Sequence, residues 1–95
     1  MAKTTSEIKQ ESYNSIKNQL DAAIANGSLL SLNGLKKVIR DLRKRIKNVE
    51  QGVVFALSLE EVNKAELVIA MLQGQCQAYQ ERLDWMNERI KAAEQ

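Results

Sequence analysis

The last third of the chain carries a long and regular pattern of apolar residues. From position 62 to position 93 they recur at alternating spacings of three and four: Val62, Ala65, Ile69, Leu72, Cys76, Tyr79, Leu83, Met86, Ile90 and Ala93. This spacing places every member on one side of a helix and is typical of coiled-coil packing. Ser58 and Glu61 before it have the spacing of a capping box. The pattern therefore predicts a helix over about 59–94.

The middle of the chain has the same spacing. Its apolar positions are Leu35, Ile39, Leu42, Ile46, Val49 and Val53, which predict a second helix over about 32–52. Continued forward, this pattern would fall on Ala56, Glu60 and Asn63. The third helix instead uses Val62 and Ala65, a shift of one residue, or about 100° around the helix axis. Together with Gly52 and the Ser58 cap, this shift favours a chain reversal and an antiparallel hairpin with an apolar tip at 53–57. The alternative is a broken rod.

A shorter amphipathic pattern precedes the hairpin and predicts a first helix over about 6–26. Its apolar stripe consists of Ile8, Tyr13, Ile16, Leu20, Ala23 and Ile24. Thr4 and Glu7 have capping-box spacing, and Gly27 stands where a left-handed residue commonly ends a helix. Ser28 or Ser31 would cap the second helix. The predicted fold class is all-α, a single domain over 1–95 with a coiled-coil-like hairpin and an N-terminal helix, and we expect it to be oligomeric.

The third helix has apolar positions outside the hairpin pattern. Leu67, Val68 and Met71 are left for a second neighbour, and Gly74 and Ala78 on the same side would let a helix approach closely. The first helix can be that neighbour, which would give a three-helix bundle.

The two helices of the hairpin differ in predicted length. The third, at about 36 residues, would be roughly 54 Å long and the second, at about 20 residues, roughly 30 Å. The last turns of the third helix should then project beyond the second. Either the first helix or a second copy of the chain would cover their apolar side chains. We predict a homo-oligomer, most simply a dimer, with a partner interface at Leu83, Trp85, Met86, Ile90, Leu67 and Met71.

Charge is unevenly distributed along the chain. Residues 31–51 hold seven basic and two acidic side chains, a net charge of +5, whereas residues 52–95 hold four basic and seven acidic ones, a net charge of −3. The basic residues away from the hairpin pattern are Lys36, Lys37, Arg40, Arg43, Lys44 and Lys47. This face could bind nucleic-acid phosphates, or it could meet the acidic third helix of the same or a neighbouring molecule.

Few residues of the chain suit catalysis or metal binding. Histidine is absent, and the one cysteine, Cys76, falls within the apolar pattern of the third helix. Nucleotide-binding glycine motifs are also absent, and the carboxylates alternate with basic residues as on a solvated helix face. We therefore expect no catalytic, cofactor or metal site. No apolar run is long enough to span a membrane or follows a basic start, so we expect a cytoplasmic protein.

These features predict a non-enzymatic interaction, assembly or adaptor protein that acts through coiled-coil surfaces. Two alternatives remain open. One is a nucleic-acid-binding regulator that uses the basic helix at 36–47, and the other is a small protein inhibitor of a host enzyme.

Overall fold

The computed structural model describes residues 3–27 and 31–94 and consists of three helices. These are α1 (Thr5–Ala25), α2 (Leu32–Val53) and α3 (Leu59–Glu94), and the described residues contain no strand. The all-α prediction is confirmed, and each predicted helix boundary lies within one residue of the observed one.

Side-chain caps begin all three helices. Three hydroxyl oxygens accept a hydrogen bond from the backbone N–H three residues ahead: Thr4 from Glu7 at 3.2 Å, Ser31 from Gly34 at 3.0 Å and Ser58 from Glu61 at 3.2 Å. Such caps satisfy donors that have no partner inside the helix. Gly27 follows α1 with a φ of 77°, the left-handed conformation that its position predicts. Ser28, the other candidate cap, lies outside the described residues.

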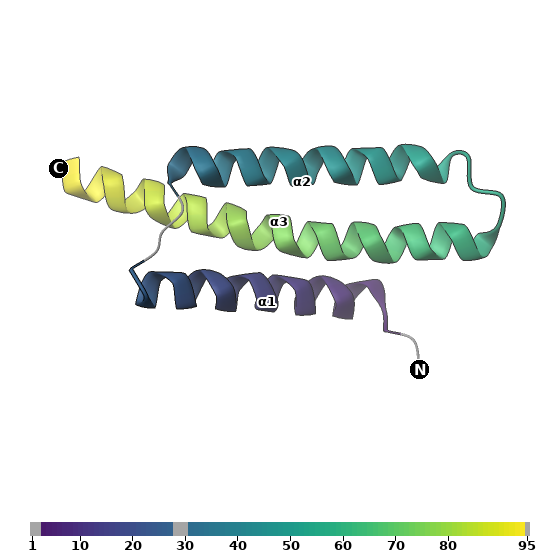
Figure 1. Cartoon of the computed structure of the whole chain (residues 1–95), viewed down its shortest axis with the longest axis horizontal. Helices are drawn as coiled ribbons and strands as arrows, with labels where there is room; N and C mark the ends of the chain where they lie inside the picture. The colour runs from purple at the N-terminus through teal and green to yellow at the C-terminus, as the bar shows by residue number, and fades with distance from the viewer. Residues whose placement is uncertain (1–2, 28–30, 95) are drawn as a thin grey trace.

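The three helices form an elongated layer of 55 × 27 × 20 Å with α3 in the middle (Figure 1). α2 runs antiparallel to α3 on one side, and α1 lies along the other side of α3. α1 and α2 do not pack on each other, unlike the outer helices of a bundle in which every pair is in contact. α3 is therefore the one helix that both neighbours depend on.

The core between α2 and α3 is built from the predicted apolar pattern. Leu35, Ile39 and Leu83 are buried and form one cluster, with Cys76 and Tyr79 half-buried beside it. Gly52, which the sequence suggested as the end of α2, lies within its last turn, and the helix continues to Val53.

The contact between α1 and α3 depends on small residues of α3. Ala70, Gly74 and Ala78 are buried, whereas no side chain of α1 is fully buried. A Cβ atom built on Gly74 would lie 2.2 Å from the backbone oxygen of Lys9, so this glycine marks a point where the two backbones nearly touch. The prediction that Gly74 and Ala78 admit a neighbouring helix is confirmed. Among the described helices, none is long and apolar enough to cross a membrane.

Candidate interaction surfaces

The C-terminal end of α3 projects less than the sequence suggested. Leu83 is only 8% exposed because it packs against Leu35 and Ile39, and Met86 is half-buried against the same cluster. The prediction that Leu83 and Met86 lie beyond α2 is therefore wrong. The physical reason is the tip, which carries the chain outward so that α3 begins beyond the end of α2 (Figure 1) and Leu83 lies beside Leu35 and Ile39. The excess length of α3 is thus shared between both ends of the hairpin.

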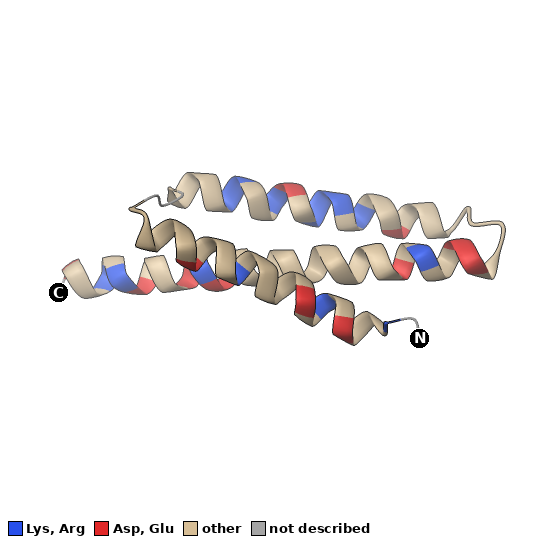
Figure 2. Ribbon diagram, turned by 60° about the horizontal axis from the view of Figure 1, so that its bottom comes forward, with Lys and Arg blue, Asp and Glu red and all other residues tan. Residues whose placement is uncertain are grey.

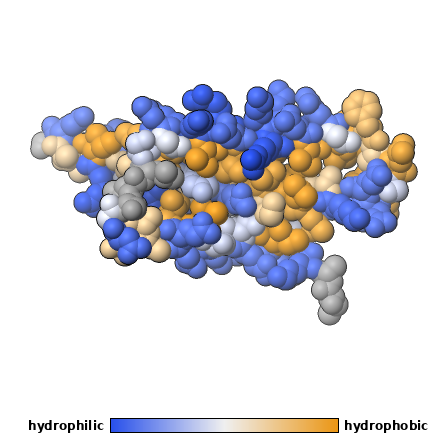
Figure 3. Space-filling model, in the orientation of Figure 1, coloured by the Kyte–Doolittle hydropathy of each residue, from blue (hydrophilic) through white to orange (hydrophobic). Residues whose placement is uncertain are grey.

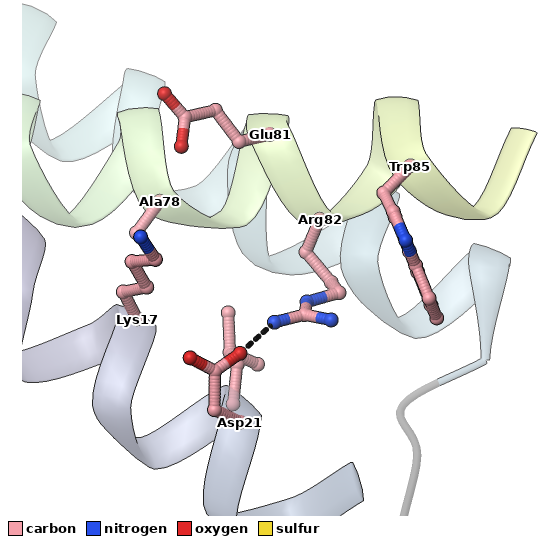
Figure 4. Close-up of a pocket in the computed structure, with 7 residues that line it drawn as sticks. Lys17, Asp21, Ala78, Glu81, Arg82 and Trp85 are labelled. Atoms are coloured by element: carbon pink, nitrogen blue, oxygen red, sulfur yellow. Dashed lines mark hydrogen bonds and ion pairs between the residues drawn. The ribbon is translucent and has the colours of Figure 1, made fainter. Parts of the chain in front are cut away.

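Trp85 and Ile90 remain exposed at this end, by 37% and 40%. Two guanidinium groups lie over the Trp85 ring, with the Cζ atoms of Arg82 and Arg89 at 5.1 Å and 4.9 Å from its centroid. Arg82 also forms a 2.5 Å ion pair with Asp21 of α1 across a shallow pocket (Figure 4). Asp21 of α1 therefore holds one of the guanidinium groups that lie over the Trp85 ring.

The two other predicted contact residues, Leu67 and Met71, lie in the first half of α3. Leu67 is half-buried, whereas Met71 and its neighbour Val68 are exposed. Apolar surface gathers over the boundary between α2 and α3 and at the hairpin tip on the face shown in Figure 3. These side chains are distant from Trp85 and Ile90 along α3, so the predicted interface is divided between two regions.

The most exposed apolar residues lie at the hairpin tip. Val54, Phe55, Leu57 and Leu59 are exposed by 78%, 81%, 92% and 74%, and we call these four the apolar tip. Sequence reasoning recognised 53–57 as a tip but did not include it among the interface residues. Part of the signal was available, because five successive apolar residues stand at 53–57, where the chain reverses. Their exposure also depends on α1 ending short of the tip (Figure 1). The carboxylates of Glu60 and Glu61 follow it directly.

The basic face of α2 is fully exposed. Its six residues are those predicted from the sequence: Lys36, Lys37, Arg40, Arg43, Lys44 and Lys47. Lysine and arginine are concentrated on α2, whereas both signs of charge occur along α3 (Figure 2). Across residues 3–27 and 31–94, no basic residue of α2 forms an ion pair. α3 of the same chain therefore does not neutralise this face.

A shallow groove separates the basic face from α3. One stretch of the groove lies between Lys36, Arg40 and Arg43 of α2 and Gln80 of α3. The adjoining stretch adds Gln73 and Gln77 of α3 and Lys9 of α1. The Arg43 guanidinium donates a hydrogen bond to the Gln80 side-chain oxygen at 3.3 Å, so the two walls touch there. No carboxylate lines either stretch.

The remaining reactive groups do not converge on one place. Cys76 is a free, half-buried thiol beside the core cluster. A hydrogen bond between the Tyr13 hydroxyl and the Glu81 carboxylate raises the pKa of Tyr13, and this contact joins α1 to α3. In the part of the chain that the structure describes, no three His, Cys, Asp or Glu residues are grouped closely enough to hold a metal ion.

The chain was compared with known families, proteins and structures. No family model, no curated protein and no solved structure matches it. The functional argument therefore rests on the apolar tip, the C-terminal end of α3 and the basic face of α2.

Proposed function

We propose that this chain is a non-enzymatic assembly protein that acts by binding protein surfaces, and that its partner is a second copy of itself. The observation that carries the proposal is the apolar tip, whose four large side chains are each at least 74% exposed. Exposed apolar clusters of this kind are costly in an isolated monomer and common in interfaces. Their burial would contribute about 1.5–3 kcal/mol for each side chain before the cost of association.

The total surface of the chain supports self-association. Its accessible area is 6940 Å². A compact monomer of 10.7 kDa should expose about 5,500 Å², so the excess is about 1,400 Å². A stable interface buries roughly 800 Å² on each partner. The elongated layer therefore exposes more surface than a dimer contact of ordinary size would need.

Charge favours an antiparallel dimer. The tip lies between Glu50 on one side and Glu60 and Glu61 on the other, so a contact between two tips would bring like charges together. Trp85 and Ile90 lie toward the opposite end of α3 from the tip (Figure 1). Acidic and basic residues are equal in number over positions 86–95. A twofold dimer that sets each tip against the partner's C-terminal end avoids the repulsion and uses both exposed apolar clusters twice.

Light scattering tests the proposal directly. We expect a mass of twice 10.7 kDa at micromolar to millimolar concentration. Replacing Val54, Phe55 and Leu57 with serine should weaken association at least tenfold without loss of helix, because these side chains contact little in the folded chain. A matched control replaces Asn14, Asn18 and Gln19 with serine; all three are exposed on α1, and the mass should stay unchanged.

Cross-linking defines the arrangement of the two copies. In a Cys76→Ser background, we expect disulfides between a Leu57→Cys chain and an Ile90→Cys chain, and few between two Leu57→Cys chains. A wild-type chain that stays monomeric at millimolar concentration would contradict self-association. If the apolar tip then captured a different protein, that protein would be its partner in place of a second copy of the chain. Strong pairing of two Leu57→Cys chains would contradict the antiparallel geometry.

A further inference from the structure

The groove between α2 and α3 has the charge and shape of a site for an extended anion, and this feature is independent of the apolar tip. We infer that the groove binds the phosphate backbone of a nucleic acid without reading its sequence. The four basic residues Lys36, Arg40, Arg43 and Lys47 recur at spacings of four, three and four along α2. They therefore form one straight row along one side of the helix, about 17 Å long. We call these four residues the basic row.

The dimensions of the basic row suit a phosphate backbone. Each strand of a duplex rises about 3.4 Å along the axis for each phosphate, so a row of about 17 Å covers the axial rise of roughly five phosphates. Lysine and arginine side chains are long and flexible enough to adjust to that repeat. The row faces solvent because α2 packs only on α3 and makes no contact with α1. A duplex can therefore approach α2 without displacing another helix.

The opposite wall of the groove also favours phosphate. Gln73, Gln77 and Gln80 recur at spacings of four and three on α3, and Lys9 of α1 adds a further positive charge beside them. Glutamine amides can donate hydrogen bonds to phosphate oxygens and carry no charge that would repel them. In the chain by itself, the amides of Gln77 and Gln80 donate to Glu81 at 3.5 Å and to Asp84 at 3.0 Å, and a phosphate would replace these acceptors. The chain has twelve acidic residues, yet the lining of the groove contains none of them. The pockets beside Trp85 and beside Lys91 differ in this respect, because Asp21 and Glu81 line the first and Asp84 and Glu88 line the second.

The same features argue against an acidic peptide and against sequence-specific recognition. A peptide partner would normally place apolar anchors in pockets, but the apolar residues of this groove belong to the chain's own core, as Ile39 and Leu83 do. Reading a mixed sequence combines arginine or lysine at guanine with Asn or Gln at adenine, on a helix that enters the major groove. The exposed side of α2 between positions 36 and 47 carries lysine, arginine and Asp41 only. Binding should therefore be electrostatic and tolerant of sequence.

Fluorescence anisotropy with a labelled duplex of about 20 base pairs tests the inference. With about five phosphate contacts, the logarithm of affinity should fall with a slope near −4.5, a loss of about 500-fold between 50 and 200 mM salt. Replacing all four residues of the basic row with glutamine should abolish binding above 50 mM salt. The matched control replaces Lys3, Lys17, Lys64 and Lys91, which removes the same charge outside the groove, and should keep affinity within about threefold at 200 mM salt.

Single substitutions and competitors complete the test. Arg40→Gln and Arg43→Gln should each reduce the salt slope by about one, with the helix content unchanged by circular dichroism. Duplexes of unrelated sequence should bind equally, and duplex RNA and DNA are compared to show which backbone binds more tightly. The inference is overturned by a wild-type chain that does not bind at 50 mM salt, or by equal losses in the row and control variants. It is also overturned by a polyglutamate peptide that displaces the duplex at equal charge concentration.

Discussion

Gly52 of α2 and Gly74 of α3 occupy opposite environments. Gly52 has no atom within 4 Å of where a Cβ would stand, whereas at Gly74 that atom would collide with the backbone of α1. Gly52→Ala should therefore raise the free energy of unfolding by about 0.5–1 kcal/mol through helix propensity. Gly74→Ala should lower it by about 1–3 kcal/mol because α1 must move away. Urea denaturation measures both, and equal effects of the two substitutions would contradict the close approach.

Tyr13 provides a pH-dependent link between α1 and α3. Its hydrogen bond to Glu81, followed by burial and the carboxylate's charge, raises its pKa above the ordinary value of about 10. Because the folded chain retains this proton more strongly than the unfolded chain, the stabilisation is fully present below about pH 10. It is lost as the pH rises through the raised pKa, since the phenolate no longer donates a hydrogen bond and is repelled by Glu81.

The titration of Tyr13 can be observed alone in a Tyr79→Phe chain through the ultraviolet absorbance of the phenolate. We expect a midpoint above the ordinary tyrosine value, and Glu81→Gln should move it back toward that value. A midpoint that Glu81→Gln leaves unchanged would show that another group causes the shift.

At the scale of the helices, local sequence signals predicted most of what is observed. The caps at Thr4, Ser31 and Ser58 and the left-handed Gly27 depend on residues within three or four positions of each other. The heptad pattern identified, for the same reason, the side chains of the cluster between α2 and α3, such as Leu35, Ile39 and Leu83. Such signals survive folding because tertiary contacts do not alter them.

The predictions that failed concern how one helix is placed relative to another, which the sequence does not encode. The overhang was predicted from helix lengths alone, and it failed at Leu83 because the tip residues displace α3 along the axis of α2. The exposure of Phe55 was missed because it depends on α1 stopping short of the tip. The composition of the groove was missed too, since Gln77 and Arg43 become neighbours only after α2 packs on α3. In each case the missing information is the relative placement of two helices.

At the scale of the whole molecule, the layered arrangement separates two surfaces of different chemistry. The apolar tip and the basic row lie at different places on the hairpin, so substitutions in one should leave the other intact. The two outer helices also differ in how many of their residues are buried against α3. α2 buries Leu35, Ile39 and Leu42 on α3, whereas α1 has no buried side chain.

This inequality predicts that α1 detaches from α3 before the hairpin unfolds. Local opening follows the burial of apolar side chains. α1 lies close to α3 along its length, but none of its residues is buried and it does not pack on α2. Native-state hydrogen exchange should therefore show protection in α1 at least about tenfold below that of α2 and α3, a difference of about 1.4 kcal/mol or more. Gly74→Ala should lower protection in α1 further while leaving the amides around Leu35 to Leu42 nearly unchanged, because that substitution disturbs only the α1 side of α3. Equal protection in all three helices would instead mean that the chain unfolds as one cooperative unit, with α1 coupled to α2 through α3.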